Sequence, residues 1–152
     1  MQMRSQTGEE LQSLAGSFIA SLMPGTQATL ITLSGELGAG KTTFAQGIAR
    51  VLGVTETVTS PTFVIEKVYD LRDSPPAGGW ERLVHIDAYR LNSSHELEVL
   101  GWKELLADEQ NLIVLEWPER VADIIPPGAH ALRFDIENEE RIITINGQEN
   151  RQ

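Results

Sequence analysis

Residues 35–43, GELGAGKTT, have the side-chain types and spacing needed to hold a phosphate chain. Gly35, Gly40, Lys41 and Thr42 match the phosphate-loop pattern G-x-x-x-x-G-K-S/T at every fixed position. Glycines allow the chain to fold into a concave nest of backbone N–H groups at a helix N-terminus, where the helix dipole adds positive potential. The segment therefore predicts a nucleotide site rather than a plain glycine turn before a helix.

Each side chain of this loop has an expected role. Lys41 contacts the β- and γ-phosphates, Thr42 offers its hydroxyl to Mg²⁺, and Thr43 bonds the α-phosphate. Hydrogen bonds to charged groups contribute about 1.5–3 kcal/mol each, so several together give useful affinity. The residues of the loop expected to bind the nucleotide are Gly38, Ala39, Gly40, Lys41, Thr42 and Thr43.

Two acidic residues that each end an apolar run are candidates to face the metal. Asp87 follows residues 83–86, and Glu116 follows residues 112–115. A phosphate loop needs an acid at the C-terminal end of a neighbouring strand, to hold Mg²⁺ directly or through water. A glutamate could hold the metal or orient a water, whereas an aspartate could equally act as base for a substrate hydroxyl. Both acids are predicted to be catalytic, together with Lys41.

The residues beside these acids leave several alternatives open. His85 and Asp87 share one face of the expected strand, but a histidine–carboxylate metal site is not favoured, because the three histidines show no paired helical spacing. Trp117 could stack on a base or a partner, or it could belong to the core. Arg90 and Arg120 could neutralise phosphate charge or simply be solvated.

The elements around the loop follow the order that such a site requires. Residues 28–33 form an apolar run typical of a buried strand, and residues 42–52 have the apolar spacing of a helix. Thr7 and Glu10 form a capping box at the start of an amphipathic helix over residues 7–23. The other expected elements are strands 63–71, 83–87 and 112–115, a mobile surface connection 72–80, a helical region 94–107, and a hairpin of 131–137 and 141–146.

Composition limits the classes of protein to be considered. A chain of 152 residues with 41% hydrophobic residues is the size of one domain, so residues 1–152 are expected to form a single one. The net charge of −10 disfavours direct binding to nucleic acid, because an acidic surface repels the phosphate backbone. Since the chain has no cysteine, no secretory apolar run and no stretch of 18 apolar residues, we expect a cytoplasmic protein without membrane contact.

The nucleotide is more consistent with ATP than with GTP. Guanine-specific switches carry N-K-x-D and D-x-x-G motifs, and neither occurs in this sequence. The main hypothesis is an ATPase. Three alternatives are a binding module gated by ATP without required hydrolysis, a small-molecule kinase, and a purely structural protein.

Four motifs together resemble the TsaE family. In this family a small bacterial ATPase works with the proteins TsaB and TsaD to make threonylcarbamoyl-adenosine beside the tRNA anticodon. The order and spacing of the motifs are similar from about residue 7 to residue 141. The motifs are GELGAGKTTF at 35–44, SPTF at 60–63, HIDAYRL at 85–91 and LEWP at 115–118.

The resemblance implies a single-domain α/β P-loop NTPase fold, with a mixed, largely parallel central sheet and a C-terminal antiparallel hairpin. It implies that ATP binds with Mg²⁺, that Thr42 and Glu116 hold the metal, and that Asp87 is needed for hydrolysis. It also implies that TsaD carries out the transfer chemistry on tRNA and that ATP hydrolysis resets the TsaB–TsaD complex. Contact with tRNA would be indirect, through that complex.

The resemblance further assigns residues outside the phosphate loop. Residues 60–63 would form a switch-like loop near the γ-phosphate, with Ser60 and Thr62 as its polar members. The N-terminal helix and the late hairpin would approach the nucleotide, and Glu9 and Glu140 are the nearest matches to nucleotide-binding positions there.

Overall fold

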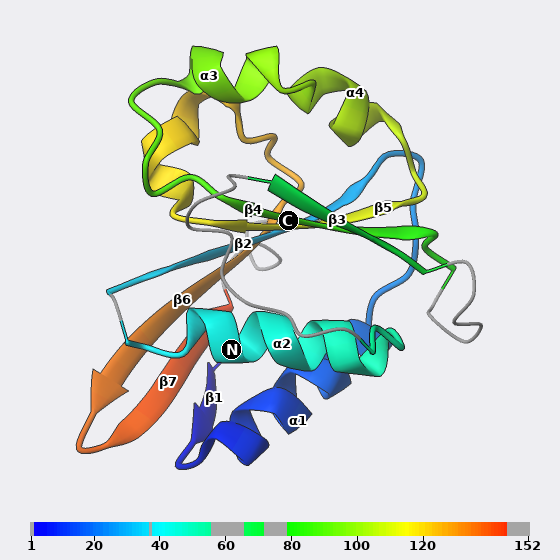
Figure 1. Ribbon diagram of the computed structural model, residues 1–152. Helices are drawn as coiled ribbons and strands as arrows, with labels where there is room; N and C mark the ends of the chain where they lie inside the picture. Colours follow the sequence, from blue (N-terminus) through cyan, green and yellow to red (C-terminus); the bar gives the residue numbers. More distant parts are fainter. Residues whose placement is uncertain (1, 37, 56–65, 72–78, 146–152) are drawn as a thin grey trace.

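The computed structural model describes residues 2–36, 38–55, 66–71 and 79–145, and a seven-stranded sheet organises them (Figure 1). The strand order is β1-β7-β6-β2-β5-β4-β3. The strands are β1 Gln2–Ser5, β2 Thr29–Gly35, β3 Glu66–Asp70, β4 Arg82–Asp87, β5 Asn111–Glu116, β6 His130–Glu137 and β7 Glu140–Ile145.

The centre of the sheet is parallel and its margins are antiparallel. Strands β6, β2, β5 and β4 run in one direction, whereas β3, β7 and β1 each pair antiparallel with their neighbours. Asn138 and Glu139 form the turn between β6 and β7, and both have left-handed backbone angles, with φ of 52° and 70°. The predicted mixed sheet and its C-terminal antiparallel hairpin are therefore confirmed.

Helices cover both faces of the sheet (Figure 1). Helices α1 (Gly8–Ala20) and α2 (Lys41–Val51) lie on one face. The short helices α3 (Ser94–Val99) and α4 (Trp102–Ala107) lie on the other, together with the 3₁₀ helix η1 (Pro118–Ile124). None of the helices in the described ranges is long and apolar enough to cross a membrane.

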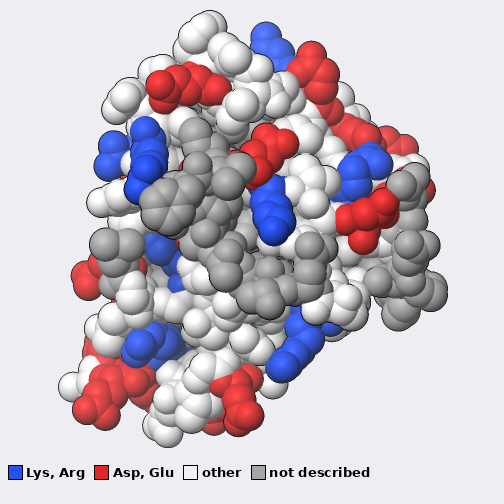
Figure 2. All heavy atoms as spheres, viewed as in Figure 1, with Lys and Arg blue, Asp and Glu red and all other residues white. Residues whose placement is uncertain are grey.

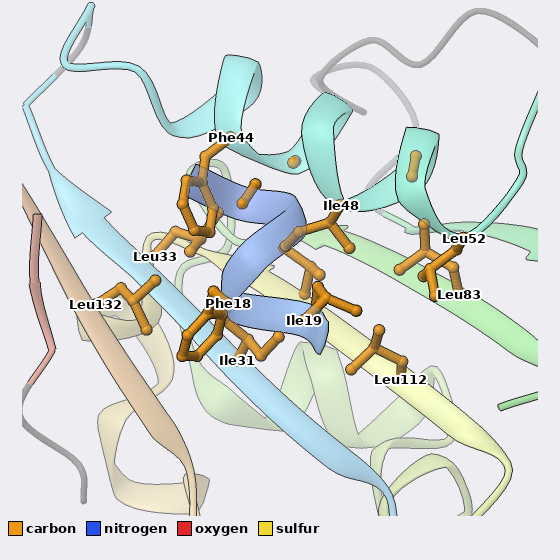
Figure 3. Close-up of a cluster of buried hydrophobic side chains, with 14 of the residues drawn as sticks. Phe18, Ile19, Ile31, Leu33, Phe44, Ile48, Leu52, Leu83, Leu112 and Leu132 are labelled. Atoms are coloured by element: carbon orange, nitrogen blue, oxygen red, sulfur yellow. The ribbon is translucent and has the colours of Figure 1, made fainter. Parts of the chain in front are cut away.

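The core under α1 and α2 fixes the position of the phosphate loop (Figure 3). Phe44 and Ile48 of α2 are fully buried and face Leu33 of β2 and Phe18 of α1. The ring centroid of Phe44 lies 6.3 Å from that of Phe18 and 5.3 Å from that of Phe134. Each such side chain contributes about 1.5–3 kcal/mol when buried. This packing holds the start of α2 against the C-terminal end of β2.

Two glycines at the contact between α1 and α2 give a matched stability prediction. A Cβ atom on Gly47 would lie 2.7 Å from the backbone of Gln12, whereas one on Gly16 would lie 3.7 Å from Val51. We expect Gly47→Ala to lower the free energy of unfolding by about 1–3 kcal/mol through overpacking. Gly16→Ala should be neutral or stabilising by up to about 1 kcal/mol, because alanine is the better helix former. Urea denaturation measures both; equal effects would contradict this account of the interface.

The start of α1 agrees with the predicted capping box. The backbone N–H of Glu10 donates to Oγ1 of Thr7 at 3.0 Å, and the Glu10 carboxylate accepts from the backbone N–H of Gln6 at 2.6 Å. The helix ends at Ala20, three residues before the predicted end. Strand β1 was not predicted, and it forms an edge of the sheet by pairing with β7.

Two other predicted segments differ from the structure. The helical region 94–107 is two helices, because the chain turns at Gly101 with φ of 93°. Residues 72–78 and 63–65 lie outside the described residues, but Trp80 is 3% exposed and donates from Nε1 to Thr29 Oγ1 at 3.0 Å. The prediction of a surface connection is therefore wrong at its C-terminal end.

Candidate functional site

The glycine-rich loop joins β2 to α2 with the backbone geometry expected of a phosphate nest. Gly38 and Gly40 have φ of 81° and 105°, a left-handed conformation that glycine adopts without steric cost. A Cβ on Gly40 would also lie 2.6 Å from Cδ2 of Leu11, so α1 packs directly on the loop. The first N–H groups of α2 have no partner within the helix and are the natural donors to an anion.

A cavity of about 430 Å³ opens at the C-terminal ends of the central parallel strands. This is where ligands bind in open α/β sheets. Its walls come from four parts of the chain: the loop and start of α2, the ends of β4 and β5, the start of α1, and β7. The lining residues are Gln6, Thr7, Gly8, Leu11, Gly38, Gly40, Lys41, Thr42, Thr43, Asp87, Tyr89, Glu116, Trp117 and Arg141.

The two predicted acids lie side by side across the cavity from the loop. Asp87 of β4 is in register with Glu116 of β5, and the two residues are 5% and 2% exposed. Oδ1 of Asp87 accepts from the backbone N–H of Tyr89 at 2.9 Å. The carboxylates of Glu116 and Asp87 are both close enough to Lys41 to favour its charged form. The three predicted catalytic residues therefore lie together at this cavity.

Lys41 is buried at the first position of α2. Its Nζ donates to the carbonyl oxygen of Gly35 and lies 3.5 Å from the ring centroid of Trp117. Trp117 has a left-handed backbone with φ of 62°, and its backbone N–H donates to the backbone carbonyl of Leu33 at 3.2 Å. A non-glycine residue in this conformation costs about 1–3 kcal/mol, a cost that is most often met at functional sites.

Of the alternatives left open for Trp117, the structure shows a core position in part, whereas stacking on a base or a partner stays a prediction. Its ring packs against the second core cluster, and it also lines the cavity. The ring centroids of Trp117 and Tyr89 are 4.9 Å apart, and the guanidinium of Arg120 lies 5.4 Å from the Tyr89 ring. These rings form an aromatic rim beside Lys41.

The buried position of Lys41 leads to a prediction about pH. Burial lowers the pKa of Lys41 below the ordinary lysine value of 10.5, and the carboxylates of Glu116, Glu119 and Asp87 partly oppose that shift. A bound phosphate favours the ammonium form and so raises this pKa. The affinity for ATP should therefore be full below the pKa of the unliganded protein and decline, by up to about tenfold per pH unit, above it.

Equilibrium binding of ATP between neutral pH and pH 10.5 checks this prediction. A Tyr89→Phe variant is the control, because it removes the phenol hydroxyl at the rim of the cavity and leaves Lys41 in place. An affinity that stays constant up to pH 10.5, the ordinary lysine pKa, would contradict the prediction.

Three other predicted residues do not line the cavity. Ala39 is fully buried within the loop. Glu9 lines a separate hollow next to Arg4. Glu140 accepts from Arg4 Nη1 at 3.0 Å and from Gln6 Nε2 at 3.3 Å, and Gln6 is a lining residue of the cavity. The nucleotide-binding roles of these three residues stay predictions, and Ser60 and Thr62 lie outside the described residues.

Several lining residues were missed by sequence reasoning. Arg141 lines the cavity and directly follows Glu140, the residue that was predicted in its place. Tyr89 lies two residues beyond Asp87 in the HIDAYRL motif, but nothing in the sequence singled it out. Gln6 and Gly8 lie at the cavity where β1, which pairs with β7, leads into the start of α1.

The oxygen atoms around the cavity suit Mg²⁺. The Thr42 hydroxyl and the carboxylates of Glu116 and Asp87 are hard ligands, which this ion prefers. Within the described ranges, no group of three or more His, Cys, Asp or Glu side chains could hold a metal by itself. Mg²⁺ usually binds through one or two protein oxygen ligands together with substrate phosphates and waters.

Similarity to known proteins covers nearly the whole chain. Residues 5–145 match the family model described as threonylcarbamoyl adenosine biosynthesis protein TsaE. The tRNA threonylcarbamoyladenosine biosynthesis protein TsaE of Bacillus subtilis is 36% identical over 151 residues, covering 97% of this chain and 86% of the relative. The protein of the same name from Streptomyces coelicolor is 43% identical over 125 residues, covering 78% and 79%. The crystal structure of Bacillus subtilis YdiB superposes with a TM-score of 0.75 at 30% identity, covering 95% of this chain and 83% of that one.

Proposed function

Because this chain belongs to the TsaE family of threonylcarbamoyl adenosine biosynthesis proteins, we propose that it is a Mg²⁺-dependent ATPase that serves this modification of tRNA. One observation carries the proposal. Lys41, Asp87 and Glu116 meet around a single cavity, which opens at the N-terminus of α2 and the ends of the parallel strands. Such a constellation suits phosphoryl transfer, where catalysis consists mostly of positioning and charge stabilisation.

The loop binds the phosphates in this proposal. Backbone N–H groups of the nest and of the first turn of α2 donate to phosphate oxygens, and Thr43 adds its hydroxyl at the α-phosphate. Lys41 exchanges its present acceptor, the Gly35 carbonyl, for oxygens of the β- and γ-phosphates. Because the walls bury Lys41, its charge acts on these phosphates with little screening by water.

The side chains that would hold Mg²⁺ are Thr42 and Glu116. The bound ion would neutralise charge on the phosphate oxygens. Asp87 is in register with Glu116 and lines the same wall of the cavity. From there it would orient the attacking water or accept a proton from that water. We assign Asp87 to hydrolysis on this ground.

The chemistry on tRNA is proposed to lie in partner proteins. On the face shown in Figure 2, lysines and arginines lie in separate spots among acidic residues, not in one continuous basic surface. The net charge of −10 likewise suits a subunit that leaves tRNA to others. We propose that the partners are TsaB and TsaD, that ATP hydrolysis resets their complex between turnovers, and that the protein works in the cytoplasm, where tRNA is modified.

Repeated rounds of tRNA modification by TsaB and TsaD test the proposal. With the Glu116→Gln variant we expect modification to stop after the first round, because the variant binds ATP without splitting it. Full support of many rounds by this variant would favour the alternative of a module gated by ATP binding alone. ATP labelled at the γ-phosphate separates the kinase alternative, since a hydrolase releases the label as free phosphate whereas a kinase leaves it on an acceptor.

A further inference from the structure

A buried histidine contacts one of the two acids of the cavity. His85 of β4 is 1% exposed, and its Nε2 lies 2.6 Å from Oε2 of Glu116. Counted for the side chains alone, His85 is 2% exposed and Glu116 is 3% exposed, so both are almost completely enclosed. Because a carboxylate oxygen can only accept, we place the proton of this hydrogen bond on Nε2 of His85.

We propose that His85 is a positioning residue that holds the carboxylate of Glu116 in the orientation in which it meets the metal–nucleotide complex. The inference rests on the proposed function and adds to it a residue that acts only through Glu116. His85 does not line the cavity within the described part of the chain.

The strand register explains why this histidine reaches this acid. Across β4 and β5, Asp87 is opposite Glu116, and His85 is opposite Val114. Residues two apart on a strand share a face, so His85 is the diagonal neighbour of Glu116 on the same face of the sheet. It lies two residues further from the C-terminal ends of the strands than Asp87 does. From there it engages Oε2, and the second carboxylate oxygen is the one we assign to the cavity.

The two neighbouring acids are supported in different ways. Asp87 accepts from the backbone N–H of Tyr89, two residues further along its own chain, so its short side chain is fixed locally. Glu116 has a longer side chain, and a buried carboxylate without a donor is costly. Residues that orient a metal-binding side chain typically contribute about 10–100-fold to metal affinity. The inference therefore concerns Glu116 specifically.

Two substitutions separate positioning from packing. His85→Phe fills the same space without a hydrogen-bond donor, and His85→Gln places an amide N–H near the position of Nε2. We expect His85→Phe to raise the Mg²⁺ concentration needed for half-maximal binding of a non-hydrolysable ATP analogue by about 10–100-fold. His85→Gln should restore most of that loss. Binding of the analogue in EDTA should stay within about twofold in both variants, since it requires no Mg²⁺.

A double-mutant cycle tests whether His85 acts through Glu116. In a Glu116→Gln background, His85→Phe should change the Mg²⁺ dependence no further. An undiminished effect in that background would overturn the inference, as would a wild-type response of the single variant. If His85→Phe does not fold, His85→Asn, whose amide is too short to reach Glu116, takes its place with the same expected result.

The same measurement distinguishes this inference from the function on which it rests. If the unsubstituted protein binds the analogue equally well with Mg²⁺ and with EDTA, the proposed metal site fails, and the role of His85 fails with it. If the unsubstituted protein shows the Mg²⁺ dependence and His85→Phe shows it unchanged, only the role of His85 is contradicted.

Discussion

Replacing Lys41 with methionine is expected to lower the affinity for ATP at least about 100-fold. Methionine keeps an apolar stem of similar length but removes the ammonium from the start of α2. Two charge-assisted hydrogen bonds to phosphate contribute about 3–6 kcal/mol together, and about 2.7 kcal/mol already corresponds to 100-fold. Titration calorimetry with Mg²⁺ and ATP measures the loss.

The fold should tolerate this substitution. Removing Nζ costs the hydrogen bond to Gly35 and the contact with the Trp117 ring, but it also removes a buried charge. We therefore expect the free energy of unfolding to change by no more than about 1–2 kcal/mol. Lys67→Met is the matched control, because Lys67 is exposed on β3 and its Nζ lies 5.4 Å from the ring of Tyr69, away from the cavity wall. A Lys41→Met protein that is folded and binds ATP like the unsubstituted chain would refute the phosphate-loop assignment.

Replacing Glu116 with glutamine is expected to lower the rate of ATP hydrolysis at least about 100-fold. The amide keeps the size of the side chain but removes the negative charge that acts on Lys41 and that, in the proposed function, would face the metal. Binding of ATP itself should change by only a few fold, because the loop and Lys41 are intact. Release of phosphate under single-turnover conditions gives the rate, and equilibrium binding gives the affinity.

Glu119 provides a matched control for Glu116. Its charge also acts on Lys41, but it is exposed at the start of η1 and does not line the cavity. Glu119→Gln should hydrolyse ATP at nearly the unsubstituted rate. Equal losses in the two variants would mean that long-range charge, and not a metal or water contact at Glu116, controls hydrolysis.

The central part of the fold could be predicted from the sequence because its signals are local. The glycine pattern marks the loop, and the apolar runs before Asp87 and Glu116 are typical of strands buried on both faces. The helix break at Gly101 was not predicted, because the apolar spacing continues across it while the backbone turns. Strand β1 is only four residues long and Met3 is its one apolar residue, so the sequence gives no strand signal there and its pairing with β7 depends on tertiary contacts.

The site was predictable to the same extent. Lys41, Asp87 and Glu116 follow from the loop and from the ends of strands, and the structure brings them together at one cavity. The contact between His85 and Glu116 depends on the register of β4 against β5, which residue types do not specify. Arg141 reaches the wall because a tight turn sets the hairpin register, whereas the family resemblance assigned its neighbour Glu140.

The measurement that tests the central claim most directly is release of phosphate from ATP with Mg²⁺, with and without purified TsaB and TsaD. We predict slow release by the protein alone and clear stimulation by the two partners together, with the activity lost in the Glu116→Gln variant. If the protein binds ATP but releases no phosphate, either alone or with both partners present, the proposed ATPase function is contradicted.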